Sequence, residues 1–266
     1  MAEPQKLVGT VARTAELIRY LAEHEGEVTV TSISRDLALA PSTVHRLLHL
    51  LMDQGFVERG LRFQSYRVGM ELYRLGNLIA KKVELTDLAV PYMEALGAES
   101  GEFVMLCLYV PSVKSLMLVR TVASAHSLTY STEMWRPEAV AWGASGRSIL
   151  AFMPEAEMRE IYSSAGPSPV TGEPLPPYSE FRVELGAIRE RGYAVTHGQK
   201  VSGAVGFSAP LFGPSGRAFA SLCLTVPEFR FDPSREPVLG EMLCRQAAAL
   251  SRAGGYAPGA GARRRA

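Results

Sequence analysis

Polar side chains recur at helical spacing between positions 41 and 51, and their chemistry suits hydrogen bonding to nucleic-acid bases. Residues three and four apart lie on one side of a helix, and hydroxyl, imidazole and guanidinium groups can all donate hydrogen bonds to base edges. This polar stripe consists of Ser42, Thr43, His45, Arg46 and His49. Because a guanidinium can bind guanine through two hydrogen bonds, Arg46 is the strongest of these for reading sequence. We therefore expect the stripe to enter a major groove.

Residues 41–51 also carry a second stripe, which is apolar. Val44, Leu47, Leu48 and Leu51 are spaced i, i+3, i+4 and i+7, which predicts the apolar face of a helix packed on a small core. Pro41 suits a first helical position, since its missing N–H would be unpaired there anyway. Any amphipathic helix of a soluble domain shows this pattern, so the neighbouring segments decide between the two interpretations.

The upstream segment, residues 31–38, predicts a second short helix. Ile33 and Leu37 should face inward, and Thr31 or Ser32 can cap the helix. About three residues then separate the two helices, which is typical of a helix-turn-helix. Arg35 on this first helix joins the residues expected to contact DNA.

The downstream segment predicts a β-hairpin. Residues 55–60 and 64–68 resemble two short strands around Gly60, and the hairpin carries Arg59, Arg62 and Arg67. Helix, turn, helix and basic hairpin in this order indicate a winged helix-turn-helix, in which Arg59 and Arg62 are expected to meet phosphates. Residues 35–70 hold five arginines against three acids, although the whole chain has a net charge of only +1. Such a modest charge favours binding by more than one copy of the domain.

The composition predicts a two-domain cytoplasmic protein. The chain has 266 residues, of which 47% are hydrophobic, enough for two cores. Since no apolar run reaches about 18 residues, a membrane span is not indicated. The three cysteines, Cys107, Cys223 and Cys244, lie far apart in apolar segments and are expected to be reduced core residues, with no metal and no cofactor bound.

The predicted elements place four segments along the chain. Residues 1–69 form the winged domain, 70–84 a linker helix, 85–253 a second domain and 254–266 a disordered basic tail. In the second domain, helices at both sequence ends enclose strands, which predicts an α+β fold. Strands are expected at 102–109, 115–121, 193–196, 205–212 and 218–226; helices at 85–100, where Pro91 should introduce a kink, and at 143–153, 155–162, 179–191 and 237–252. The linker helix has more apolar residues than so small a domain can bury, so we expect two chains to pair there.

A binding pocket is predicted in the second domain. Residues 143–146 open a helix, and free N–H groups at a helix N-terminus attract a carboxylate or similar anion. Val140 and Trp142 could form an apolar wall, and along the last strand Cys223 and Thr225 should point to one face while Leu222 and Leu224 point to the other. The alternative is that Trp142 belongs to the core and the glycines only turn the chain.

Two other classes of function are kept open. Cys223 with His197 could act as a nucleophile and base, but no third orienting group or oxyanion motif is recognisable, so we expect no catalytic residues. A scaffold that binds small molecules or proteins without DNA is the second alternative.

Short strings carry a family resemblance from about residue 11 to 252. They are PSTVHRLL at 41–48, GFV at 55–57, YRVG at 66–69, LG at 75–76, GR at 146–147, LA at 150–151, RERGYA at 189–194, Gly203, AP at 209–210, and Pro227 with Arg230. In this order they resemble the isocitrate lyase regulator (IclR-type) family of bacterial transcription factors. The resemblance implies a winged helix for DNA, a GAF-like or profilin-like effector domain, and a homodimer or dimer of dimers on a roughly palindromic operator.

The resemblance also implies where an effector binds. Cys223 and Thr225 match a Ser-Val-Ser pair whose hydroxyls contact the effector in the family, with one hydroxyl replaced by a thiol. The full set expected to bind a small organic effector, bearing a carboxylate or an aromatic ring, is Val140, Trp142, Gly143, Ala144, Gly146, Thr196, Gly206, Cys223 and Thr225. The protein is thus expected to be a transcriptional regulator whose operator affinity changes with the effector. A repressor is favoured over an activator.

Three departures from the family pattern bear on these expectations. Ala38 replaces the usual glycine between the two helices, so the turn lacks the residue suited to positive φ. Residues 139–145 read AVAWGAS where the family has Pro-Leu-His-Ala-Thr-Ala, and Arg147 replaces lysine. After residue 194 the acids usual in the family are missing at Thr196 and Gln199. An obvious site for a cationic ligand is thereby absent.

Overall fold

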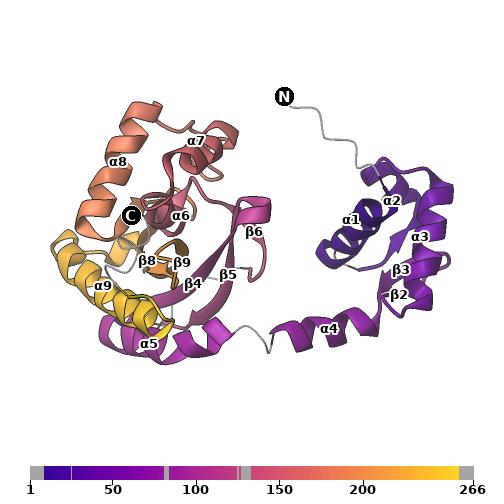
Figure 1. Ribbon diagram of the computed structural model, residues 1–266, viewed down its shortest axis with the longest axis horizontal. Coiled ribbons are helices and arrows are strands. Elements are labelled where there is room, and N and C mark those ends of the chain that lie inside the picture. The colour runs from indigo at the N-terminus through magenta and orange to yellow at the C-terminus, as the bar shows by residue number, and fades with distance from the viewer. Residues whose placement is uncertain (1–8, 25, 81–83, 125, 127–132, 258–266) are drawn as a thin grey trace, which may run out of the picture. The chain divides into compact units, whose positions relative to one another are not determined.

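The computed structural model describes residues 9–24, 26–80, 84–124, 126 and 133–257, and the chain divides into two compact units, Met1–Val83 and Glu84–Ala266 (Figure 1). Most of the predicted basic tail, residues 258–266, lies outside the described residues. Within its described part, Tyr256 stacks on Phe212 with ring centroids 5.1 Å apart.

The first unit is a winged helix-turn-helix followed by a fourth helix. Its elements are α1 (Thr10–Glu23), β1 (Val28–Thr29), α2 (Val30–Asp36), α3 (Pro41–Asp53), β2 (Val57–Arg59), β3 (Ser65–Val68) and α4 (Met70–Ala80). The strands form an antiparallel sheet in the order β1-β3-β2. Leu17, Ile33, Val44, Leu48 and Tyr66 are fully buried between helices and sheet. Both the helix-turn-helix and the hairpin therefore stand where the sequence predicts them.

The start of α2 and the turn after it differ from the expectation. Thr29, and not Thr31 or Ser32, is the cap: its hydroxyl accepts from the Ser32 N–H at 3.2 Å while the Ser32 hydroxyl accepts from the Thr29 N–H at 3.0 Å. This reciprocal capping box satisfies two helix-end donors, so the helix begins one residue earlier. Ala38 adopts a φ of 52°, so the turn keeps its left-handed conformation without a glycine. An L-residue in that conformation stores about 1 kcal/mol of strain.

The second unit is built on a six-stranded antiparallel sheet in the order β6-β5-β4-β9-β8-β7. Its strands are β4 (Phe103–Val110), β5 (Ser115–Val122), β6 (Pro137–Ala139), β7 (Ala194–His197), β8 (Ala204–Phe212) and β9 (Ala218–Pro227). Its helices are α5 (Glu84–Ser100), α6 (Gly143–Leu150), α7 (Glu155–Ser164), α8 (Tyr178–Arg191) and α9 (Glu236–Ala253). Pro91 lies inside α5, as expected, and β6 is an edge strand that the sequence does not indicate.

The two faces of this sheet carry separate cores because side chains alternate along each strand. One face packs Val104, Leu106, Leu222 and Leu224 against α5 and α9. The other face carries Cys107 and Cys223 and is covered by α6, α7 and α8 (Figure 1). The predicted alternation of Cys223 with Leu222 and Leu224 is thus confirmed. In the described part of the chain no helix has the length and apolar character needed to span a membrane.

Candidate functional site

The polar stripe of α3 faces solvent, on the side opposite the core. Val44, Leu47, Leu48 and Leu51 are at most 4% exposed, which fixes the helix on the core by its apolar face. The other side of the helix is then held outward by the same packing. The polar stripe is exposed except for Thr43, which is half-buried: Ser42, Thr43, His45, Arg46 and His49. The rings of His45 and His49 lie one turn apart with centroids separated by 6.5 Å.

The arginines around α3 differ in how tightly they are held. No hydrogen bond or ion pair within the described residues engages the side chains of Arg46 and Arg62. Arg35, by contrast, is bound to Asp36 at 2.7 Å. Arg59 lies over the ring of the buried Tyr66, 4.7 Å from its centroid, and donates to the Tyr66 hydroxyl at 2.9 Å. Arg46 and Arg62 are therefore the arginines most available to a ligand, whereas Arg59 is fixed in direction on the hairpin.

A carboxylate anchors the tip of the hairpin. Glu27 accepts hydrogen bonds from the N–H groups of Leu61 at 2.6 Å and Arg62 at 3.0 Å, and from the Ser65 hydroxyl at 2.6 Å. These bonds, that of Ser65 first, lower the pKa of Glu27 to about 2. Gly60 is needed here, because a side chain would come within 2.5 Å of the Glu27 carboxylate. The sequence offers no hint of this contact, since Glu27 lies 34 residues before Leu61.

The second unit contains a cavity of about 70 Å³ between the N-terminus of α6 and the sheet strands β7, β8 and β9. Six of the nine predicted effector residues line it: Gly143, Ala144, Thr196, Gly206, Cys223 and Thr225. The strand register explains why they meet, since Thr196 pairs with Gly206 and Gly206 with Thr225 across neighbouring strands. Gly206 brings no side chain, so the helix can approach the sheet at this point.

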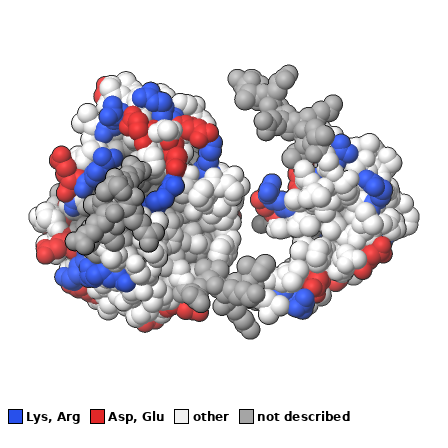
Figure 2. Space-filling model, in the orientation of Figure 1, with Lys and Arg blue, Asp and Glu red and all other residues white. Residues whose placement is uncertain are grey.

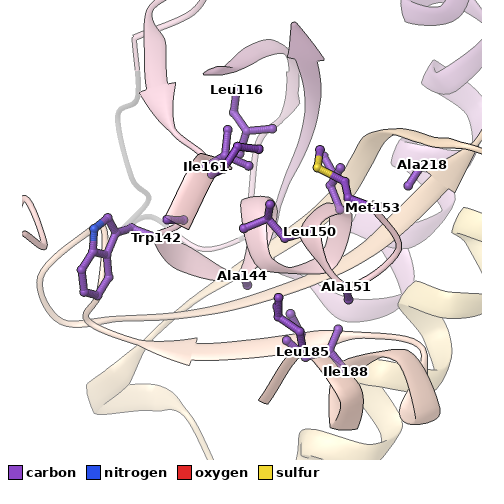
Figure 3. Packing of buried hydrophobic residues seen from close by; sticks show 14 of the residues in the cluster. Leu116, Trp142, Ala144, Leu150, Ala151, Met153, Ile161, Leu185, Ile188 and Ala218 are labelled. Carbon is purple, nitrogen blue, oxygen red and sulfur yellow. The ribbon is translucent and has the colours of Figure 1, made fainter. Parts of the chain in front are cut away.

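Three predicted effector residues lie outside the cavity lining and belong to the core. Val140 is 2% and Trp142 5% exposed, and the Trp142 Nε1–H donates to the Gly166 carbonyl at 3.0 Å. Figure 3 shows Trp142 at the edge of the same buried cluster as Leu150 and Leu185. Gly146 lies against the main chain: a Cβ there would be 1.8 Å from the Val140 carbonyl oxygen. These three residues pack in the core and do not line this cavity, so their role in binding an effector stays a prediction.

The cavity lining also includes eight residues outside the predicted effector set: Met105, Ser145, Gln199, Lys200, Val201, Ala204, Phe207 and Leu224. Its polar members among them, Ser145, Gln199 and Lys200, start α6 or follow β7. Gln199 accepts a hydrogen bond from the Gly143 N–H at 3.3 Å, so one of the helix-end donors expected to bind an anion is already engaged. The Lys200 ammonium lies 2.6 Å from Glu138 and 3.5 Å from the Ser145 hydroxyl. The only indication in the sequence is the polar pair 199–200 after a predicted strand.

A chain of buried hydrogen bonds runs from the cavity beneath α6. The Cys223 thiol lies 3.3 Å from the Ser208 hydroxyl, which in turn is 2.8 Å from Ser148 on α6. Ser148 donates to the Ser145 carbonyl at 3.1 Å, and Ser145 lines the cavity. Any group that binds at Cys223 is therefore linked to the first turn of α6 by polar contacts that burial strengthens.

The geometry excludes a Cys223–His197 pair. Thr196 faces the cavity together with Cys223 and Thr225, so the next residue of β7, His197, points to the opposite face of the sheet. There its ring contacts Phe231 with centroids 6.0 Å apart. The thiol and the imidazole are separated by the sheet itself, and the enzyme alternative based on them is wrong.

Surface charge does not form one large patch on the visible face. Figure 2 shows basic and acidic residues interspersed over the second unit and scattered over the first. This agrees with the net charge of +1. Binding to a polyanion must therefore depend on individually placed groups and not on the field of the whole molecule.

Comparison with known proteins decides what this pairing of a helix-turn-helix with a cavity-bearing domain represents. Residues 10–60 match the IclR helix-turn-helix domain, and residues 78–252, well over half of the chain, match the bacterial transcriptional regulator IclR C-terminal domain. The chain belongs to the IclR family. It is a DNA-binding transcriptional regulator and not an enzyme.

Relatives and solved structures agree with this membership over nearly the full length. The transcriptional repressor IclR of Escherichia coli is 23% identical over 240 residues, which cover 90% of this chain and 88% of the repressor. A crystal structure of an IclR-type regulator from a Silicibacter species matches with a TM-score of 0.81 at 22% identity, covering 94% of this chain and 97% of that one. An IclR homologue from Microbacterium hydrocarbonoxydans, solved with 4-hydroxybenzoate, matches with a TM-score of 0.76 at 21% identity, covering 92% and 99%.

Proposed function

We propose that this IclR-family regulator acts as a repressor that reads a roughly palindromic operator with α3 and responds to a small carboxylate bound in the cavity under α6. The observation that carries the DNA part is the division of α3 into two faces. Four buried apolar side chains fix the helix on its core, while the opposite face presents Arg46 without a partner among the described residues. A helix held in this way can lay its outer face in a major groove.

The contacts divide by role. Ser42, Thr43, His45 and Arg46 are assigned to base edges, and His49, one turn further along, is assigned to the rim of the groove. Arg62 and Arg59 are assigned to phosphates. Arg59 is already directed by Tyr66, so it gives up little side-chain entropy on binding. Arg35 contributes less, because a phosphate must compete with Asp36 at 2.7 Å for its guanidinium.

Pairing of two chains is assigned to the linker region. Met70 is 68% and Leu78 44% exposed on α4, and both are large apolar side chains that a partner chain can cover. A two-fold dimer would place two α3 helices on two half-sites, which makes the operator palindromic.

The cavity favours a small organic acid. Lys200 and Ser145 provide a cation and a hydroxyl, while Met105, Ala144 and Val201 provide apolar contacts. A volume of about 70 Å³ suits a molecule of only a few heavy atoms, and a larger aromatic acid requires the side chains of Gln199 and Lys200 to move aside. The solved homologue with bound 4-hydroxybenzoate supports including an aromatic acid among the candidate ligands to be tested.

The test is a selection followed by a titration. Full-length protein is used to enrich duplexes from a random pool, and the affinity for the enriched duplex is then measured with and without acetate, lactate, benzoate or 4-hydroxybenzoate. We expect an inverted repeat to emerge and at least one acid to change the affinity by about 5- to 150-fold, the usual range of coupling between two sites. Failure to enrich any sequence contradicts the DNA assignment, and indifference to every acid contradicts the effector assignment.

A further inference from the structure

Two apolar side chains project from the hairpin tip with almost no cover. Leu61 and Phe63 are each 91% exposed, the highest values among the large hydrophobic residues of the described chain. They flank Arg62, and together residues 61–63 are called the wing tip here. Single exposed apolar residues are common on protein surfaces, but two such residues around an arginine that has no partner among the described residues are a specific arrangement.

The wing tip is held in this exposed state by the Glu27 anchor. The carboxylate accepts hydrogen bonds from the main-chain N–H groups of both Leu61 and Arg62 and from the Ser65 hydroxyl, and the Ser65 N–H donates to the Arg62 carbonyl at 3.2 Å. Gln64 closes the loop with a φ of 53°. A free loop with these side chains would be able to fold them back onto the core. Here four hydrogen bonds fix the backbone, so the apolar groups stay outward.

The charge around the wing tip suits a nucleic acid better than an apolar protein surface. Glu27 is the nearest acid, and its oxygens are taken up by three hydrogen bonds. Glu58, the acid of the adjoining strand, is bound to Arg67 at 3.3 Å. The Arg62 guanidinium makes no hydrogen bond or ion pair among the described residues, although its charge helps, after those hydrogen bonds, to lower the pKa of Glu27. An arginine is drawn to the negative potential of a narrow minor groove, and apolar side chains beside it can press between base pairs.

We propose that the wing tip enters the minor groove next to the major groove read by α3, and that Phe63, supported by Leu61, partly unstacks one base step in each half-site. This rests on the proposed DNA-binding function and adds to it a deformation of the DNA. The operator would then prefer a flexible pyrimidine–purine step at a position that no side chain reads by hydrogen bonding, because such steps unstack at the lowest cost.

The experiment uses the full chain and the duplex it enriches from a random pool. Permanganate, which oxidises thymines whose stacking is disturbed, is applied to the free duplex and to its complexes with the parent, Phe63→Ala, Phe63→Trp and Val11→Ala. Val11 is the control because it is also an exposed apolar residue of this unit, 85% accessible, on the separate helix α1. Mass in solution without DNA is measured for each protein.

We expect one reactive step per half-site in the parent complex, retained with Phe63→Trp and Val11→Ala and abolished with Phe63→Ala. The affinity of Phe63→Ala for the enriched duplex should fall about tenfold, as expected for one large apolar side chain left uncovered. An enriched duplex that shows no reactive step, or the same step with Phe63→Ala, overturns the inference while leaving DNA binding intact. A change of mass with Phe63→Ala assigns the tip to a protein contact and overturns it too. If no duplex is enriched, the proposed function fails and this inference with it.

Discussion

Glu138 and Lys200 form an ion pair of 2.6 Å at the cavity under α6, and neither residue is prominent in the sequence. Their side chains are 27% and 18% exposed, so water screens the pair only in part. Lys200 also covers Gly143 at the start of α6, where a Cβ would lie 3.2 Å from the lysine Cβ. A carboxylate ligand must therefore share or displace Glu138 to reach the lysine.

This ion pair predicts that replacing Glu138 and replacing Lys200 change the affinity for a carboxylate ligand in opposite directions. Glu138→Gln should strengthen binding of the responsive acid by about tenfold, since it removes the competitor for the lysine, and Lys200→Gln should weaken it by about tenfold. Calorimetric titration of the purified proteins measures both changes. Lys114→Gln serves as the control, because Lys114 pairs with Glu160 and lines a different cavity. Equal affinities in all three variants would remove Lys200 from the ligand site.

The anchor at Glu27 predicts a stability that depends on pH. Its pKa is near 4.5 in an unfolded chain and about 2 in the folded one. The ionised form is thus favoured by folding, and its contribution is complete above pH 4.5 and disappears as the pH falls towards 2. The difference in unfolding midpoint between the parent and Glu27→Gln should accordingly be largest near neutral pH and shrink on acidification below the unfolded pKa. A difference that stays constant over that range would show that the carboxylate does not anchor the wing.

The strained turn at Ala38 predicts a stabilising substitution. Ala38→Gly should stabilise the first unit by about 1 kcal/mol, because glycine adopts a φ of 52° without strain. For a unit of this size the melting temperature should rise by roughly 4–8 °C. Both tryptophans, Trp135 and Trp142, lie in the second unit, so their fluorescence should not shift while the circular dichroism transition does. Ala15→Gly on α1 is the control and should lower stability by about 1 kcal/mol.

In the second unit, replacing Gly146 with alanine is predicted to lower stability. Gly146→Ala forces a Cβ within 1.8 Å of the Val140 carbonyl oxygen, a clash that side-chain rotation cannot relieve. We expect stability to fall by more than about 3 kcal/mol, seen as an earlier tryptophan fluorescence transition on urea unfolding. Gly186→Ala is the matched control on α8, where a Cβ meets nothing within 4 Å, and it should stabilise by about 0.5–1 kcal/mol. Similar stabilities for the two variants would refute the packing role given to Gly146.

Residues with strong local periodicity can be placed from the sequence. The two stripes of α3 follow the helical period, and the alternation along β9 follows the strand period, which puts Arg46 on the outer face and Cys223 on the cavity side, as the structure confirms. On α1 the apolar spacing predicts an inward face of Val11, Ala15, Ile18, Leu21 and Ala22. Leu21 is buried as predicted, but the other buried residue is Leu17, and Val11 is 85% exposed. Thr14 lies on the same side of α1 as Leu17 and Leu21. Because Thr14 is polar, a search for regularly spaced apolar residues does not identify this side as the buried one.

Contacts distant in sequence cannot be placed in this way. Glu27 reaches Leu61, and Gln199 reaches Gly143, through side chains that no period relates. β6 has only three residues and begins with a proline, so neither length nor alternation reveals it. Trp142 could not be assigned from the sequence either, because an aromatic residue before a glycine-rich turn suits a ligand wall and a core equally well. Tertiary packing decides such cases.

Whether the outer face of α3 reads base sequence can be measured by comparing Arg46→Ala with Arg62→Ala on the enriched duplex and on duplexes altered at single base pairs. We predict that Arg46→Ala weakens the preference at one base pair per half-site, reducing discrimination there by roughly 5- to 150-fold. Arg62→Ala should instead weaken all duplexes alike and reduce the slope of log affinity against log salt by about one for each half-site bound, because one phosphate per domain is no longer neutralised. If Arg46→Ala weakens specific and random DNA equally, α3 does not read the base sequence through Arg46.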